Sequence, residues 1–208
     1  MRLAWLLAAS LALQAASAPI VRFTKDFPGS SPAFVSIWVD RSGGGEFNDT
    51  SDGSQPSVAF QLDPGETEAI FALVAKLGEF SRPLESPLKV AFTGTKIFRF
   101  ENGAARREVK FNYSEDPAAQ ALLDWFERIA ETSLHRINLE RSARFDRLGV
   151  DRALLLLQVS VDRRRLAGAS QLLPTLDRLA KNQSTFNRVR ERAAAIAELI
   201  RAGGTKAK

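Results

Sequence analysis

The residues that could carry out chemistry are few in this sequence. It contains no cysteine and a single histidine, His135. A lone histidine between Glu131 and Glu140 in a helical pattern is typical of a solvated surface residue, and a zinc site would need mostly carboxylate ligands, which is unusual for that metal. Neither a Gly-x-Ser-x-Gly nor a His-Glu-x-x-His motif occurs. The sequence therefore predicts no catalytic set, no metal site and no cofactor.

Two polar segments have compositions that resemble binding loops. Residues 48–56 contain Asp49 and Asp52 and are similar in composition to calcium loops, but their spacing does not match an EF-hand. Residues 43–45 are three glycines without a following Lys-Ser/Thr, which favours a flexible hairpin turn over a phosphate cradle. Carboxylates that are distant in sequence can converge in a fold, so a hydrolase with carboxylate chemistry stays open as a hypothesis.

Arginine side chains form the strongest feature that packing does not explain. Residues 163–165 are three consecutive arginines, and arginines alternate along the last helical segment at residues 188–192. The candidate anion-binding residues are Arg163, Arg164, Arg165, Arg188 and Arg192. One interpretation is a surface for an anionic partner, such as a membrane or an acidic protein face. The other is a set of solvated helix faces with intrahelical pairs, such as Arg188 with Glu191.

The two halves of the chain differ in charge. Residues 19–117 hold 11 Lys/Arg against 14 Asp/Glu, net −3, and residues 118–208 hold 17 against 10, net +7, which with Arg2 gives the overall +5. Hydrophobic residues make up 45% and charged residues 25%, the balance of a folded globular protein. The two parts of the chain therefore differ in electrostatic character, and export makes nucleic acid an unlikely partner.

The first eighteen residues have the pattern of a secretory signal peptide. Arg2 precedes an apolar run at residues 3–13 and small residues at 15–18, so cleavage is predicted near Ser17 or Ala18. The run is shorter than the about 20 residues of a spanning helix. An uncleaved N-terminal anchor is the alternative. The predicted location is periplasmic or extracellular, and no second apolar run of spanning length occurs in the mature chain.

The pattern of the next 123 positions predicts an α+β domain over residues 19–141. Residues 34–39 read as an inner strand, followed by strands at 46–48, 58–62, 88–100 (one strand or two, interrupted at Gly94) and 108–113. Residues 19–32 carry few regular signals. Asp63-Pro64 and Asp116-Pro117 each begin a helix, because Asp suits the N-cap and Pro the first turn. We therefore expect an antiparallel sheet of about four or five strands packed by two helices.

The character of the chain is helical from Pro117 onward. Trp125 and Phe126 are part of an apolar stripe, and we expect Trp125 to be buried against the sheet, with Trp125→Ala costing about 3–5 kcal/mol. Residues 142–203 form an all-helical extension, which is either a subdomain or packs back on the sheet. Within it, residues 153–161 favour helix over strand, Ser184 is the expected cap of the last helix, and residues 204–208 are expected to be disordered.

The order of these segments resembles uncharacterised small exported bacterial proteins of unknown function. The signal segment, the strand–helix–hairpin–helix order and the helical tail at 166–200 carry that resemblance, which implies no activity and no site. We expect an exported non-enzymatic binding or interaction module of unknown ligand, with another protein or an anionic envelope surface as partner. The alternatives are an envelope- or polyanion-associated protein acting through its arginine-rich helices, and the carboxylate hydrolase.

Overall fold

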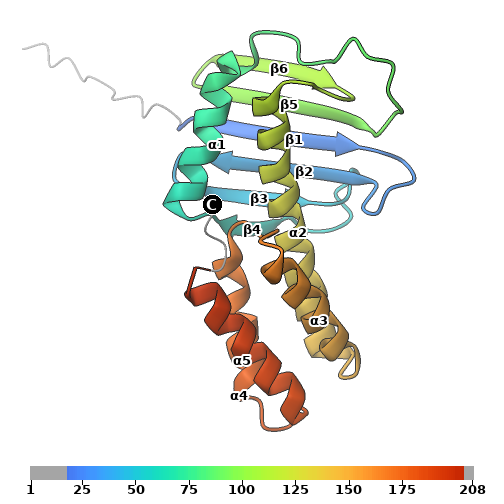
Figure 1. The fold of residues 1–208 in the computed structure, drawn as a ribbon, viewed down its shortest axis with the longest axis vertical. Helices are drawn as coiled ribbons and strands as arrows, with labels where there is room; N and C mark the ends of the chain where they lie inside the picture. The colour runs from blue at the N-terminus through green and yellow to red at the C-terminus, as the bar shows by residue number, and fades with distance from the viewer. Residues whose placement is uncertain (1–17, 204–208) are drawn as a thin grey trace, which may run out of the picture.

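The chain folds as an α+β sheet domain followed by a helical extension (Figure 1). The computed structural model describes residues 18–203, so the predicted signal segment up to residue 17 and the predicted tail at 204–208 lie outside the described residues. The strands are β1 (Ile20–Asp26), β2 (Phe34–Asp40), β3 (Gly44–Asn48), β4 (Val58–Gln61), β5 (Thr95–Asn102) and β6 (Ala105–Phe111). They form one antiparallel sheet in the order β4-β3-β2-β1-β5-β6.

The centre of this sheet contains a strand that the sequence pattern did not reveal. β1 pairs with both β2 and β5, and it raises the strand count to six. Its Val21 and Phe23 are buried, whereas the intervening Arg22 and Thr24 are only partly covered. By contrast, the predicted strand at 88–93 is not a strand, because pairing begins only at Thr95. These residues are exposed instead.

Helices α1 (Pro64–Lys76) and α2 (Pro117–Phe145) cover the same face of the sheet, as expected (Figure 1). The carboxylate of Asp116 accepts the amides of Ala118 and Ala119 at 2.8 and 3.4 Å, which caps α2 as predicted. Residues of one parity along each strand point toward these helices, since side chains alternate between sheet faces. Cross-strand neighbours Phe98, Phe23, Ile37 and Phe47 form one continuous row under the helices.

The prediction that Trp125 is buried against the sheet is confirmed only in part, because the indole packs against the sheet core but is not fully buried. Its neighbour Phe126 is the buried residue: it stacks on Phe23 at 5.1 Å between ring centroids and lies 5.9 Å from Phe98. Successive residues of an α-helix point about 100° apart, so only one of the two rings can face the centre of the sheet. Trp125 is half-buried and faces the boundary with the helical extension.

The long helix α2 belongs to both parts of the molecule. It runs unbroken through the predicted boundary at 141/142 and ends at Phe145, a length of about 43 Å at 1.5 Å per residue. Its first turns cover the sheet, and its last turns pack on α3 (Figure 1). The rest of the extension is α3 (Gly149–Asp162), η2 (Ala169–Leu172), α4 (Leu173–Lys181) and α5 (Asn187–Arg201). Another short segment, η1 (Gly78–Phe80), follows α1.

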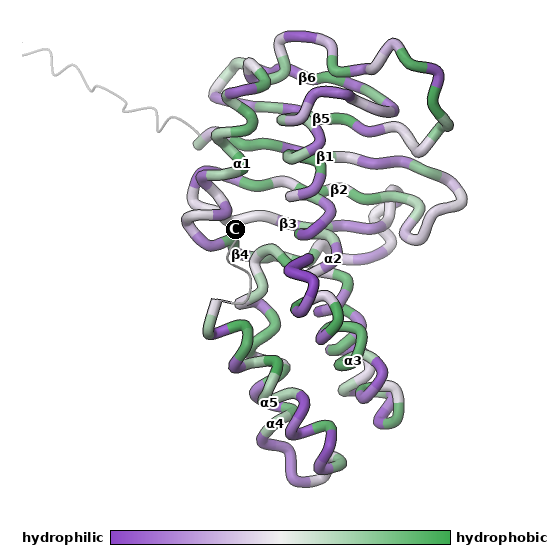
Figure 2. Tube along the Cα trace, in the orientation of Figure 1, coloured by the Kyte–Doolittle hydropathy of each residue, from purple (hydrophilic) through white to green (hydrophobic). Residues whose placement is uncertain are grey.

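The extension has its own apolar core. Figure 2 shows hydrophobic and hydrophilic residues along each of its helices, as amphipathic helices require. The predicted helix at 153–161 is confirmed as α3, whose Leu154 and Leu157 are fully buried. Ser184 does not cap the last helix, because Phe186 occupies that position and Ser184 bonds to the Asn182 side chain. Among residues 18–203, no helix has both the length and the apolar character needed to cross a membrane.

Buried polar contacts join the sheet domain to the extension. The Glu66 carboxylate at the start of α1 accepts the amide of Gly168, with the shorter N···O distance 2.9 Å. The Arg128 guanidinium donates to the carbonyl of Leu166 at 2.9 Å. Gly168 has φ +65°, and a Cβ there would lie 3.0 Å from the carbonyl oxygen of Gln61, so glycine suits this close approach. The extension therefore docks through specific hydrogen bonds as well as apolar packing.

Candidate functional site

The structure separates the five candidate anion-binding arginines into two groups. Arg165 forms ion pairs with acidic residues of α2. Its guanidinium contacts the carboxylate of Asp124, and its Nε lies 3.5 Å from Oε2 of Glu131. Arg188 and Arg192 converge on the single carboxylate of Asp151. Arg165 connects the segment after α3 to α2, and Arg188 and Arg192 connect α5 to α3, so intramolecular pairing already accounts for these three guanidiniums.

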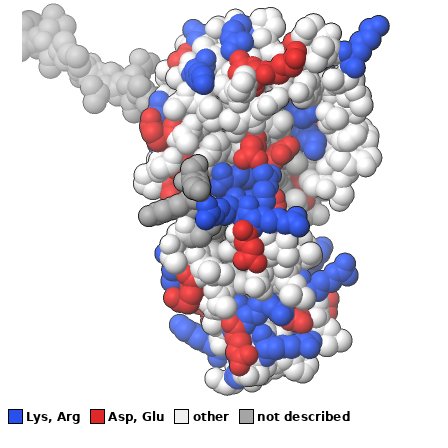
Figure 3. Space-filling model, viewed as in Figure 1, with Lys and Arg blue, Asp and Glu red and all other residues white. Residues whose placement is uncertain are grey.

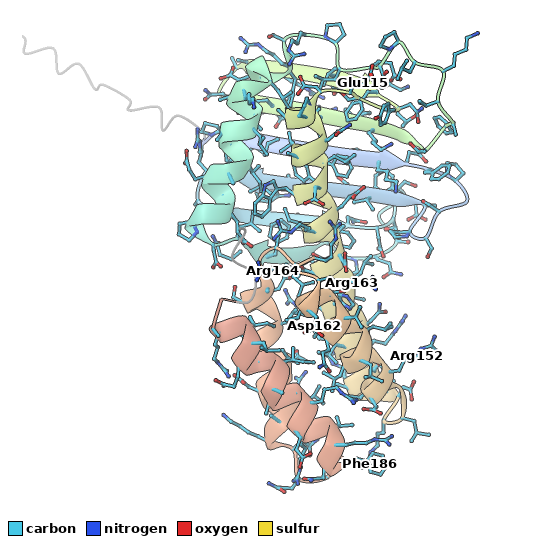
Figure 4. All side chains as sticks on the ribbon, in the orientation of Figure 1. Glu115, Arg152, Asp162, Arg163, Arg164 and Phe186 are labelled. Carbon is cyan, nitrogen blue, oxygen red and sulfur yellow. The ribbon has the colours of Figure 1, made fainter. Side chains whose placement is uncertain are left out.

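Arg163 and Arg164 are exposed where α3 ends, at the waist between the sheet domain and the extension (Figure 4). Within residues 18–203, neither guanidinium has a carboxylate within 4.0 Å. Figure 3 shows Lys and Arg side chains gathered at this waist, with acidic side chains above and below them. The acidic neighbours reduce the attraction of the waist for an anion, because their field opposes that of the arginines.

A cavity lies at the junction between the two parts of the molecule. It has a volume of about 630 Å³, and we call it the junction cavity. The first turns of α1 form one wall, Trp125 of α2 forms another, and η2 and the ends of α4 and α5 close the opposite side. Its lining includes the apolar side chains of Ala69, Ala169, Leu173 and Ile200. A mainly apolar cavity of this size with a few polar groups is the usual form of a small-molecule site.

The polar groups of the junction cavity come from both sides. Asp63 is the exposed N-cap residue of α1, and its carboxylate has no ion-pair partner within 4.0 Å in the part of the chain that the structure describes. Ser170 contributes an exposed hydroxyl from η2. Arg201 lines the cavity too, but its guanidinium is held by Asp177 at 2.6 Å and by Glu198 at 2.7 Å. The acceptor available to a ligand is therefore Asp63.

Two buried charged residues, Glu66 and Arg128, lie next to the junction cavity. Glu66 accepts the amides of Asp63 at 3.0 Å and Gly168 at 2.9 Å, and burial raises the pKa of its carboxyl. Arg128 stacks on Trp125, with its guanidinium carbon 4.2 Å from the ring centroid, and burial lowers its pKa. Its Nε atom has no hydrogen-bond partner among residues 18–203. These contacts fix the indole ring in place, and they use the Glu66 oxygens for structure.

A second cavity, of about 430 Å³, lies beside the start of α2. It contains the buried amine of Lys96, whose pKa is lowered by burial and, to a smaller extent, by Lys25. Lys96 Nζ donates to the carbonyl of Asn112 at 2.7 Å and to the hydroxyl of Thr93 at 3.0 Å. These acceptors hold the amine between the end of β6 and the chain that leads into β5, which gives Lys96 a structural role.

The structure contradicts the interpretation of His135 as a solvated surface residue. Its side chain is 16% exposed, and its Nε2 lies 2.9 Å from the Ser160 hydroxyl between α2 and α3. Ser160 donates to Glu131 at 2.5 Å, so the carboxylate bonds to the serine and not to the second ring nitrogen of His135. A catalytic triad requires the histidine to bridge serine and acid. This group is therefore a polar contact between helices.

The polar loop at 48–56 also uses its carboxylates locally. Asp52 accepts the backbone amide of Ser54 at 2.9 Å, and Asn48 accepts that of Thr50 at 2.7 Å. Within residues 18–203, no group of three or more histidine, aspartate and glutamate side chains could hold a metal ion.

Sequence reasoning missed the junction cavity because its residues come from four separate segments. One signal was present: Trp125 and Phe126 are adjacent, so a helix that buries one ring must turn the other away. No model of a known protein family matches this sequence, and none of the curated proteins matches it. The function of the protein is therefore inferred from its geometry.

Proposed function

We propose that this protein is an exported, non-enzymatic binding module and that the junction cavity is its ligand-binding site. The observation that carries this proposal is the half-buried Trp125, held from one side by Arg128 and open to a cavity of about 630 Å³. A large aromatic side chain at the wall of a cavity usually provides a stacking surface for a ligand. The pattern of residues 1–18 is the reason for proposing export.

The lining of the cavity indicates the chemistry of the ligand. A flat apolar group can lie on the indole ring and against Ala169 and Leu173, while hydroxyl or amino groups donate to the carboxylate of Asp63. An anion is disfavoured there, because Asp63 is the acceptor that lacks an ion-pair partner among the described residues and Arg201 is already paired. The ligand class is therefore a small neutral or cationic molecule with an apolar face, such as a sugar or an amine.

Binding is favoured over catalysis by the way the two carboxylates of the cavity are used. Acid–base catalysis needs a titrating group within hydrogen-bond reach of the substrate. Glu66 has the raised pKa that such a group would need, but its oxygens accept the amides of Asp63 and Gly168. A ligand would meet Asp63 alone, which can hold a donor.

Fluorescence of Trp125 tests the proposal directly. The sequence has three tryptophans, and Trp5 lies in the predicted signal segment, so Trp38→Phe in residues 19–208 leaves Trp125 as the only tryptophan. We expect titration of this variant with a panel of sugars, amino acids and polyamines to give a saturable change in emission for at least one compound. In calorimetry, Trp125→Ala and Asp63→Asn should each weaken binding of that compound at least about tenfold.

Trp38→Ala is the matched control, because Trp38 lies on the open face of the sheet, where its indole donates to Glu46 at 3.2 Å. It should leave the affinity unchanged. The proposal is rejected if the compound binds Trp125→Ala and Asp63→Asn as tightly as it binds the unmodified protein, or if binding is lost only with Trp38.

A further inference from the structure

Three large apolar side chains are exposed together at the far end of the helical extension. Phe145 is 82% exposed, Leu148 76% and Phe186 54%. Phe145 is the last residue of α2, Leu148 lies in the turn from α2 to α3, and Phe186 lies in the turn from α4 to α5. We call these three residues the tip. Figures 1 and 4 show both turns at the end of the extension farthest from the sheet, and Phe186 is labelled there.

The two turns are held side by side by specific contacts. The guanidinium of Arg147 donates to the carbonyl of Ser184, which joins one turn to the other. Both turns also line one shallow cavity of about 210 Å³, to which Arg147 and Phe186 contribute. The tip is therefore one surface built from two segments that are 41 positions apart, counted from Phe145 to Phe186.

The position of the aromatic residues is not explained by folding. Residues 142–203 contain two aromatic residues, Phe145 and Phe186, and both lie at the tip. The buried core of the extension consists of aliphatic side chains. Exposed apolar groups that gather on one surface usually mark an interaction site, whereas singly scattered ones need no explanation.

Basic side chains surround the tip. Residues 141–152 hold four arginines against two aspartates, net +2. Both aspartates are engaged: Asp146 accepts the amide of Gly149 at 2.8 Å, and Asp151 pairs with Arg188 and Arg192. The arginines are Arg141, Arg144, Arg147 and Arg152, and no ion pair with a carboxylate is formed by any of them among residues 18–203. The surface around the three apolar side chains of the tip is thus positively charged.

We propose that the tip docks on the surface of an anionic lipid bilayer. Phe145, Leu148 and Phe186 would enter the boundary between headgroups and acyl chains, and the surrounding arginines would contact anionic headgroups while their stems lie along apolar chains. A second copy of the chain is a poorer occupant. Three side chains on two projecting turns cannot supply the about 800 Å² per partner that a stable interface buries.

This inference does not rest on the proposed ligand site, because the tip and the junction cavity lie at opposite ends of the extension. It also uses different arginines from the five that the sequence singled out. The arginines of residues 141–152 are distributed over the end of α2, the following turn and the start of α3 with no recognisable cluster in the sequence, and the fold brings Arg144 and Arg147 beside Phe186.

Vesicle cosedimentation of residues 19–208, the form that the predicted cleavage leaves, tests the proposal without the apolar run at residues 3–13. We expect binding to vesicles of phosphatidylglycerol with phosphatidylcholine, weak binding to phosphatidylcholine alone, and a marked loss of affinity between about 0.05 M and about 0.5 M NaCl. The variant Phe145→Ser/Leu148→Ser/Phe186→Ser should bind at least about tenfold more weakly. Arg141→Gln/Arg144→Gln should also lose about tenfold and should show a shallower dependence on salt.

Each variant has a matched control at the other end of the molecule. Leu88, Val90 and Phe92 are 55%, 41% and 59% exposed in the chain that leads into β5, so changing all three to serine removes as many exposed apolar side chains. Arg106→Gln/Lys110→Gln removes two exposed charges from the β6 edge. Both controls should bind vesicles as the unmodified protein does. Circular dichroism should show that every variant remains folded.

Three results would overturn the proposal. One is unchanged vesicle binding by the serine variant of the tip. Another is an equal loss of binding in the control variants, which would indicate general adsorption of a basic protein. The third is a concentration-dependent dimer, seen in analytical ultracentrifugation, that the tip variant abolishes while the unmodified protein fails to bind vesicles. That result would assign the tip to a second copy of the chain.

Discussion

The sheet domain and the helical extension bury different kinds of side chain. The core under α1 and α2 is rich in phenylalanine: Phe23, Phe47, Phe60, Phe71, Phe80, Phe98, Phe100, Phe111 and Phe126. The core of the extension consists of leucine, isoleucine, valine and alanine. Helices that pack through small residues approach each other closely, whereas the layer between a sheet and its helices is about 10 Å thick and is filled by large rings. The composition of each core therefore matches its geometry.

The boundary between the two cores is polar, which neither core is by itself. Glu66, Arg128 and Thr132 are buried there, and each makes a hydrogen bond to or from the backbone at residues 166–168. Directional bonds fix the orientation of the extension on the sheet domain more narrowly than apolar contact would. The comparison indicates that the cores supply most of the stability and that the boundary determines the shape of the junction cavity.

The largest expected effect comes from removing a ring at the centre of the sheet core. Phe126→Ala should lower the free energy of unfolding by about 3–5 kcal/mol, because the fully buried ring stacks on Phe23 and packs at a tilt against Phe98. Trp125→Ala, one position earlier, should cost only about 1 kcal/mol, because the indole is half-buried at the cavity wall. Urea unfolding measures both values. Equal losses would show that the indole is part of the sheet core after all.

A substitution that creates a cavity in the core of the extension should lower the free energy of unfolding somewhat less. Leu154→Ala removes a fully buried aliphatic side chain from α3 and should cost about 2–4 kcal/mol. Because α2 is continuous across both parts, we expect the whole molecule to unfold in one transition. Tryptophan fluorescence, which reports on the sheet and the junction, should then coincide with far-UV circular dichroism. Two separate transitions would show that the extension unfolds independently.

At the polar boundary, Glu66→Gln should lower the free energy of unfolding by about 1–3 kcal/mol. Both amides, those of Asp63 and Gly168, donate to Oε2 of Glu66, and the Gly168 nitrogen also lies 3.2 Å from Oε1. In glutamine one of these oxygens becomes an NH2 group, a donor that would face the Gly168 amide, which is also a donor. Burial raises the pKa of Glu66 from the ordinary value of 4.5. The contribution of this group to stability is thus complete below pH 4.5 and is lost as pH rises through the raised value.

The stability gap between the unmodified protein and Glu66→Gln should therefore narrow as pH rises from 4.5. Chemical unfolding at a series of pH values measures this gap. Glu68→Gln is a suitable control, because Glu68 is exposed on the same helix. A gap that widens with pH would mean that the charged carboxylate stabilises the boundary.

Local signals in the sequence were sufficient to predict where helices begin and end. Asp63-Pro64 and Asp116-Pro117 begin helices, and Gly78 ends α1 with φ +63°, as their types predict. β1 alternates as a strand should, but it follows a predicted signal segment and its outward residues are polar. Its importance comes from pairing with β2 and β5, which are distant in sequence.

The candidate site depended more heavily on long-range contacts. The direction in which Trp125 points is decided by Phe126, which fills the space above Phe23. Arg165 and Arg192 look alike in the sequence as exposed basic residues, yet ion pairs with α2 and α3 occupy them in the fold. Spacing along one helix cannot reveal partners that another helix supplies.

The smallest expected effect concerns the polar contact within the extension. His135→Gln should cost about 1 kcal/mol at neutral pH, because the bond to Ser160 is partly buried and is not to a charged group. Burial lowers the pKa of His135 from 6.5, and the charge of Glu131 opposes that shift only in part. The contribution of neutral His135 is complete above pH 6.5 and is lost as pH falls through the lowered value.

His135 and Glu66 should therefore give opposite pH dependences from the two regions. Acidification lowers the stability of the extension, because His135 must take up a proton in a site that disfavours its charge. At the boundary acidification raises stability, because Glu66 becomes neutral in a buried site. Hydrogen exchange at several pH values can separate them, since it reports on the amides of α3 and on that of Gly168 individually. We expect α3 to lose protection below pH 6.5 in the unmodified protein and to keep it in His135→Gln. Loss of protection in both proteins would assign the acid sensitivity to another group.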